Sequence, residues 1–225
     1  RYINGKSQKL AVIYVNNDFG KGGQTTIKQL LAGSPTQVVA EISTDQGQID
    51  FSSAVIQAKQ AGADAIFAYT NEEESARLLR ELRKQGWTKP VIGETTLTSS
   101  KVVELAGEAA NGAVAHVGLT VEAPPLQDFG KRYQALYNGV PDHNGVKGYT
   151  GMYILKAAIE KAGKVDQKAA AAAIRNSCFS ATQHKGVLMD VCFDDKGDLD
   201  RESFITEIRN GKTVVAETLP PLNKK

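Results

Sequence analysis

Residues 9–20 read KLAVIYVNNDFG, and this stretch decides the fold. Its first seven residues, Lys9 followed by six apolar residues, form a run of strand length. Polar residues then lead into a helical pattern with Ile27, Leu30 and Leu31 on one face. An apolar run without alternation is typical of a parallel strand that is covered on both faces of its sheet. The stretch therefore predicts a strand, a tight turn and a covering helix.

The same unit recurs along the chain up to residue 118. Further apolar strands are expected at residues 37–42, 64–69, 90–93 and 113–117. The helices between them are expected to stop at Gly33, Gly62 and Gly86, because glycine adopts the left-handed conformation that ends a helix. Asp50 is positioned to cap the helix before Gly62. This alternation predicts an α/β fold with a doubly wound parallel sheet and right-handed crossovers.

The pattern changes after residue 118. Pro124-Pro125 marks residues 119–125 as a linker. Three helices without intervening strands are expected at residues 129–137, 146–162 and 166–176, and short closing strands at residues 186–193, 203–208 and 213–217. The tail from residue 220 is expected to fray.

The composition narrows the function classes. Of 225 residues, 41% are hydrophobic and 23% charged, as in an ordinary globular protein. The 27 basic and 25 acidic residues nearly balance, which gives no electrostatic reason to expect a nucleic-acid partner. No apolar stretch approaches the roughly 20 residues of a membrane span, and the first residues do not form a leader, which we expect to be absent or already removed.

Polar loops follow three of the predicted strands, at residues 16–20, 70–74 and 94–96. Ligands of an open parallel sheet bind beyond the carboxyl ends of its strands. Asn71 and Glu74 have the spacing of a capping box, while a carboxylate at Glu72 is also suited to receive a ligand ammonium group. Phe19 is either a core residue or a ligand platform. The candidate ligand-binding residues in these loops are Phe19, Thr70, Asn71, Glu72, Glu94 and Thr95.

Patterns for catalysis, nucleotides and metals are weak, so we expect no enzyme activity, cofactor or metal. The glycines after Phe19 form neither GxGxxG nor a P-loop. The three histidines lack metal-ligand spacing, and His116 falls in a predicted strand, where a core position is expected. The acidic residues from Asp194 to Asp200 do not match a calcium loop, which favours a charged hairpin turn. Cys178 and Cys192 are either a disulfide of an oxidising compartment or two buried thiols.

Several segments, taken in order, resemble the second half of leucine/isoleucine/valine-type periplasmic binding proteins, the type I solute-binding proteins of ABC importers. The resemblance runs from Lys9 to Glu217, and its most specific segments are residues 11–14 with 18–22, 64–67 with 78–80, Gly93 with 106–112, and 193–198. It implies two α/β lobes joined by three hinge crossings, with the ligand held between them.

The resemblance also implies a division of the chain. Residues 9–118 and about 200–218 correspond to the second lobe, and about 124–185 to helices of an incomplete first lobe. Residues 119–123 and about 186–199 correspond to hinge segments. The N-terminal half of the same protein is expected to complete the first lobe, so the chain is a fragment, a nicked product or half of a two-chain assembly. Without that half, the faces bearing Phe129, Tyr133 and Tyr149 are expected to be uncovered.

The function implied by the resemblance is that of a carrier. It binds an amino acid or similar small polar metabolite by hinge closure and delivers it to a membrane permease, in the periplasm or, in a Gram-positive, at the membrane outside the cytoplasm. A ligand-sensing receptor or regulator domain is the alternative. Family members place pocket residues at Phe19, at the end of the third strand and, more loosely, at Tyr149.

The ammonium-binding carboxylate of leucine-type members aligns with Thr95, one residue after Glu94. Either Glu72 or Glu94 supplies the charge, or the ligand lacks a free amine. Export of the protein also favours a Cys178–Cys192 disulfide, closing a loop worth up to ~3 kcal/mol.

Overall fold

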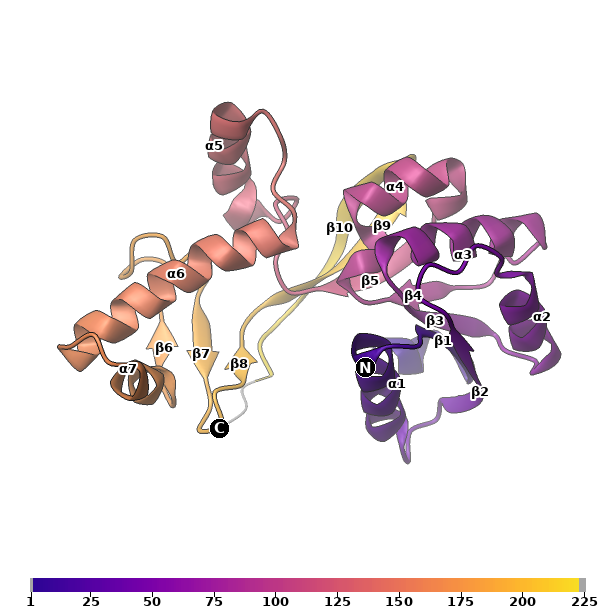
Figure 1. Cartoon of the computed structure of the whole chain (residues 1–225), viewed down its shortest axis with the longest axis horizontal. Coiled ribbons are helices and arrows are strands. Elements are labelled where there is room, and N and C mark those ends of the chain that lie inside the picture. The colour runs from indigo at the N-terminus through magenta and orange to yellow at the C-terminus, as the bar shows by residue number, and fades with distance from the viewer. Residues whose placement is uncertain (1, 223–225) are drawn as a thin grey trace. The chain divides into compact units, whose positions relative to one another are not determined.

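The structure, a computed structural model, describes residues 2–222 and divides into two compact units (Figure 1). Unit 1 contains the residues up to His116 together with Thr206–Val214. Unit 2 contains Val117–Ile205 and the residues from Val215 onward. The chain therefore passes between the units three times, at 116/117, 205/206 and 214/215.

A seven-stranded sheet with the order β10-β9-β5-β4-β3-β1-β2 organises unit 1. Its first five strands along the chain pair in parallel, which confirms the predicted α/β class. Their positions agree with the sequence patterns to within two residues. The strands are β1 (Lys9–Val15), β2 (Gln37–Thr44), β3 (Ala65–Tyr69), β4 (Val91–Gly93), β5 (Ala113–Val117), β9 (Ser203–Arg209) and β10 (Lys212–Leu219).

Helices cover both faces of this sheet, as continuous apolar strands require. Successive residues of β1 enter different cores: Ala11 and Ile13 pack in a cluster with Leu78 of α3, whereas Leu10 and Val12 pack in a second cluster. The helices are α1 (Asp18–Leu31), α2 (Ser52–Gln60), α3 (Glu72–Lys84) and α4 (Ser100–Ala106), with 3₁₀ turns η1 (Ile3–Gly5), η2 (Thr95–Thr98) and η3 (Gly107–Ala110).

Glycines end three helices of unit 1 as the sequence predicts, and Asp50 bonds to the first turn of α2. Gly33, Gly62 and Gly86 have φ values of 75°, 70° and 73°, so the predicted left-handed stops are confirmed. At the start of α2, the Asp50 carboxylate accepts a hydrogen bond of 2.7 Å from the Ser52 amide, although Phe51 occupies the N-cap position. Asp50 therefore supports the first turn of the helix from one residue further out.

Unit 2 is built from three helices and a small antiparallel sheet. Its helices are α5 (Gln127–Tyr137), α6 (His143–Ala162) and α7 (Gln167–Ile174), preceded by the 3₁₀ turn η4 (Pro124–Leu126). The sheet has the order β6-β7-β8, with strands β6 (Cys178–Phe179), β7 (Val191–Phe193) and β8 (Leu199–Asp200). A disulfide joins Cys178 of β6 to Cys192 of β7, which are paired directly across the sheet.

The acidic run after Phe193 forms the turn between β7 and β8. The Asp194 carboxylate accepts hydrogen bonds from the amides of Lys196 (2.9 Å) and Asp198 (2.8 Å). The interpretation as a charged hairpin turn is therefore confirmed.

Four details differ from the sequence predictions. Residues 119–125 are more than a linker, because Leu119 and Ala123 are buried in the core of unit 2 and η4 follows them. The strand predicted over 186–193 is confined to β7, and Gly186 has a φ of 89°.

The other two concern side-chain burial. Phe129 is only 5% exposed, because it packs in the unit's own core with Tyr133 and Tyr149, both half-buried. His116 is exposed rather than a core residue, since side chains alternate along β5 and its neighbours Ala115 and Val117 occupy the buried side.

Candidate functional site

The topology of unit 1 points to the loops after β1 and β3. These strands are neighbours in the sheet, and the connection from β1 runs to β2 on one side while the connection from β3 runs to β4 on the other. In open parallel sheets, ligands bind at this switch point, outside the carboxyl ends of the strands. Here, the ends of β1 and β3 lead into the starts of α1 and α3.

An aromatic pair lies at this switch point. Phe19, in the first turn of α1, contacts Tyr69 at the end of β3, with ring centroids 4.5 Å apart. Phe19 is 39% exposed, so it is not a core residue. The turn is tight because a Cβ on Gly20 would lie 1.8 Å from the Val15 carbonyl oxygen. The sequence patterns missed Tyr69, since it ends an apolar strand and lacks a polar loop's signature.

Glycine also makes room for the second ring. A Cβ on Gly23 would lie 2.4 Å from a ring carbon of Tyr69, so α1 can approach this ring only with glycine at that position. Burial raises the pKa of the Tyr69 phenol, and the negative charge of Glu94 raises it further. The Glu94 carboxylate therefore lies close enough to the aromatic pair to affect the pKa of Tyr69.

Glu94 is engaged by its own loop. Its carboxylate accepts a hydrogen bond of 2.8 Å from the Thr96 amide and a second from the Thr96 hydroxyl, which caps η2. The Thr96 hydroxyl also lies 2.8 Å from the Thr70 carbonyl oxygen, linking the ends of β3 and β4. Thr95 donates a longer hydrogen bond, 3.4 Å, to the His116 carbonyl. Thr96 thus links these loops, although the sequence patterns placed it in a candidate loop without assigning it a role.

Thr70 supports the loop from inside. Its side chain is fully buried, and its hydroxyl lies 2.8 Å from that of Ser75 in α3. Within unit 1, the Thr70 hydroxyl is therefore already hydrogen-bonded and does not face open solvent. By contrast, the half-buried Glu72 side chain makes no hydrogen bond or ion pair with any other residue between 2 and 222.

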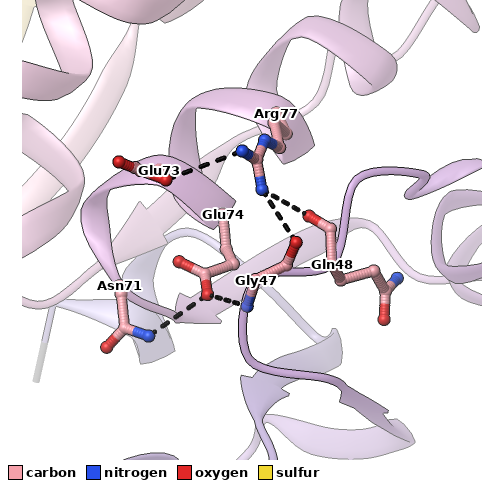
Figure 2. Close-up of polar contacts among 6 residues, drawn as sticks. All are labelled: Gly47, Gln48, Asn71, Glu73, Glu74 and Arg77. Carbon is pink, nitrogen blue, oxygen red and sulfur yellow. Dashed lines mark hydrogen bonds and ion pairs between the residues drawn. The ribbon is translucent and has the colours of Figure 1, made fainter.

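The start of α3 departs from the capping box that the sequence predicts (Figure 2). Asn71 occupies the N-cap position, but its side chain accepts no hydrogen bond from the helix and instead donates one of 3.3 Å to Glu74. The Glu74 carboxylate accepts a 2.7 Å hydrogen bond from the amide of Gly47, in the loop after β2. The predicted capping box is wrong, because a loop 27 residues earlier in the chain provides the donor.

Six of the seven candidate ligand residues thus lie in unit 1, in the loops at the carboxyl ends of β1, β3 and β4. Tyr149 belongs to α6 of unit 2, where its ring lies 4.7 Å from that of Phe129 and 5.0 Å from that of Tyr153. Interaction with the Tyr149 side chain raises the pKa of the Arg132 guanidinium.

Metal ligands and membrane spans were also sought among residues 2–222. Over that range, no three His, Cys, Asp or Glu side chains gather as metal ligands would. None of the helices in the same range combines the length and apolar character that crossing a bilayer requires.

Comparison with known proteins places this fold in a family. The family model described as periplasmic binding protein matches residues 2–213. The leucine-, isoleucine-, valine-, threonine- and alanine-binding protein of Pseudomonas aeruginosa is 25% identical over 207 residues, which are 88% of this chain and 52% of that protein. The chain thus spans about half the length of this curated relative.

Solved structures have the same fold. A leucine-binding protein from Thermotoga maritima superposes with a TM-score of 0.78 at 22% identity, over 98% of this chain and 63% of that one. A solute-binding protein of an ABC transporter from R. palustris, in complex with benzoate, superposes with a TM-score of 0.78 at 18% identity, over 97% and 61% of the two chains. Since the family model covers nearly the whole sequence, this chain belongs to the periplasmic binding protein family.

Proposed function

We propose that this chain is part of the solute-binding component of an ABC importer and that the loops after β1, β3 and β4 form one side of its ligand site. The observation that carries the proposal is the Phe19–Tyr69 pair at the switch point of the sheet, in which Phe19 is exposed and Tyr69 is half-buried. The exposed part of such a pair offers an apolar surface for a ligand side chain. The polar groups around it fix the orientation of a small metabolite.

The proposed mechanism is closure of two lobes on the ligand. Unit 1 is the second lobe, and unit 2 contributes helices to the first lobe, which the remaining length of the relatives would complete. Contacts from both lobes stabilise the closed form, and a membrane permease recognises that form outside the cytoplasm. Such a carrier needs no catalytic group, because binding and release are its whole reaction.

For the ligand we propose an amino acid or similar small polar metabolite, with Glu72 as the residue that receives an ammonium group. Glu94 is less suited, since its carboxylate already accepts two hydrogen bonds from Thr96. Glu72 has no partner within residues 2–222 and lies at the first position of α3. A charge-assisted hydrogen bond to a ligand amine would satisfy it.

A thermal-shift screen of the full-length protein tests the proposal. The probes are L-leucine, L-threonine, L-glutamate, acetamide and benzoate, because a ligand that binds only the folded state raises the melting temperature. We expect at least one amine-bearing probe to raise it in the wild type, and Glu72→Gln to remove that shift. The matched control is Glu73→Gln, one residue further along α3, which is expected to keep the shift.

Two results would count against the proposal. If no probe shifts the wild type, the ligand class is wrong. If a probe binds but Phe19→Ala and Glu72→Gln both leave its affinity unchanged, the ligand does not use this edge of the sheet.

A further inference from the structure

Residues 45–48 form the first part of the connection between β2 and α2, and they lie beside the turn that precedes Phe19. The Asn16 amide donates a 2.7 Å hydrogen bond to the carbonyl of Thr44, directly before this loop. The Asn17 side-chain amide lies 3.4 Å from the Gln46 side-chain oxygen. Asn17 also caps α1, because its side-chain oxygen accepts a hydrogen bond of 2.9 Å from the Gly20 amide. The position of residues 45–48 therefore bears on the start of α1.

Two side chains of α3 hold this loop (Figure 2). Glu74 accepts from the Gly47 amide at 2.7 Å, and Arg77 donates to the carbonyls of Gly47 (3.0 Å) and Gln48 (2.9 Å). Within the loop, the Gln48 side chain accepts from the Asp45 amide at 2.9 Å. The backbone of the loop is thus bound by one acceptor and one donor from consecutive turns of the same helix.

Hydrogen bonds rather than apolar burial fix this loop. Gly47 is exposed, and the neighbouring apolar residue Ile49 is 80% exposed. Glu74, in contrast, is only 3% exposed, and a buried carboxylate is costly unless its oxygens are hydrogen-bonded. The shorter of its two hydrogen bonds, 2.7 Å, goes to the loop and not to its own helix, which begins without a side-chain cap. Glu74 is therefore directed at the loop.

We propose that Glu74 and Arg77 are positioning residues for the candidate ligand site. They hold residues 45–48 in one conformation, and through Thr44 and Gln46 these residues hold Asn16 and Asn17, the turn from which Phe19 projects. The importance of this arrangement for a ligand rests on the proposed function, but the coupling between the two loops does not. Residues 45–48 thus form a fourth loop at the candidate site, beside the three that the sequence indicated.

Hydrogen exchange of the full-length protein, measured without ligand, tests this coupling. Glu74→Ala and Arg77→Met are expected to speed amide exchange in residues 45–48 and 16–20 by about tenfold, the change that loss of one ordinary hydrogen bond gives. Residues 78–84, the body of α3, are expected to keep their exchange rates. Glu74→Gln is expected to restore part of the protection, because its amide oxygen can still accept from Gly47.

The matched control is Glu73→Ala. Glu73 is adjacent, with a side chain 63% exposed, and meets Arg77 only in an ion pair of 3.6 Å, so its removal is expected to leave both loops unchanged. If Glu74→Ala speeds exchange throughout unit 1, the test of the coupling rests on Arg77→Met. The Arg77 side chain is partly exposed, so its replacement is expected to disrupt the core less. Faster exchange in 45–48 without any change in 16–20 would refute the coupling. Because no ligand is involved, this result is independent of whether the proposed carrier function holds.

Discussion

Gly23 is the residue on which the aromatic pair depends. A Cβ at this position would overlap the Tyr69 ring, whereas a Cβ on the neighbouring Gly22 would meet nothing within 4 Å. Both glycines lie inside α1, where alanine is favoured over glycine by up to about 1 kcal/mol. Replacing Gly22 therefore tests helix propensity alone, whereas replacing Gly23 also tests packing against the Tyr69 ring.

We expect Gly22→Ala to raise the free energy of unfolding and Gly23→Ala to lower it by about 1–3 kcal/mol, the usual cost of overpacking. Gly23→Ala should also change the near-ultraviolet circular dichroism, because the Tyr69 ring must move. Urea denaturation of both variants measures the difference. Equal stabilisation by the two substitutions would show that the ring is not confined as described.

The Tyr69 phenol is expected to ionise above the ordinary range for tyrosine. Burial favours its neutral form, and the Glu94 carboxylate does so as well, so the pKa is raised in the folded state. This contribution to stability is complete below the pKa of an unfolded tyrosine and is lost as the pH rises through the folded pKa. Difference titration of the phenolate absorbance, wild type minus Tyr69→Phe, measures it.

Glu94→Gln is expected to move the pKa of Tyr69 back only part of the way, since burial remains. An unchanged Tyr69 titration would mean that the two side chains do not interact.

At the scale of the element, helices were predictable where apolar residues recur on one face, and strands where apolar runs are continuous. The five parallel strands were found because apolar runs of four to seven residues alternate with helical patterns. Strand β6, only two residues long, gives no such signal. Helix stops were predictable from glycine, which is a local property of the backbone.

Contacts between elements were not predictable in the same way. The capping box failed because Glu74 binds an amide 27 residues earlier, and Thr96 was missed because it bonds to Thr70, 26 residues earlier. Spacing along one helix contains no information about such donors. The sequence therefore located the loops of the candidate site, whereas the bonds that organise them required the fold.

The disulfide between β6 and β7 is the main covalent support of unit 2. It joins residues separated by 14 positions, and a loop of that length contributes about 3 kcal/mol through the unfolded chain. We expect Cys178→Ser with Cys192→Ser to destabilise the small sheet and its contacts with α6. Hydrogen exchange of the full-length protein should show the loss in residues 177–193 but not in β1–β5. Uniform loss across both units would contradict this local role.

On the scale of the whole molecule, unit 2 exposes several large apolar side chains. They lie on α5, on α6 and in the turn between them, at Leu136 (76% exposed), Tyr137 (67%), Val140 (63%) and Met152 (65%). Large exposed apolar side chains often mark a surface that a partner or another part of the protein covers. We expect the 225-residue chain alone to bind a hydrophobic dye and to self-associate.

Under the proposed function, a full-length protein is expected to bind far less dye, because the length that the relatives have in addition would cover these residues. Dye fluorescence and light scattering of the two proteins at equal concentration make the comparison. Similar dye binding by both would show that this surface stays open. In the 225-residue chain, the single substitution Leu136→Lys is expected to reduce self-association without affecting unit 1.

The three passages between the units have a consequence for biosynthesis. Unit 1 draws its last nine residues, 206–214, from the far end of the sequence, and they include parts of β9 and β10 at one edge of its sheet. During translation, β5 therefore leaves the ribosome with an unpaired edge and waits until about ninety further residues have been made. An edge left open for that interval is where a chaperone would hold the nascent polypeptide, and where two unfinished copies would join.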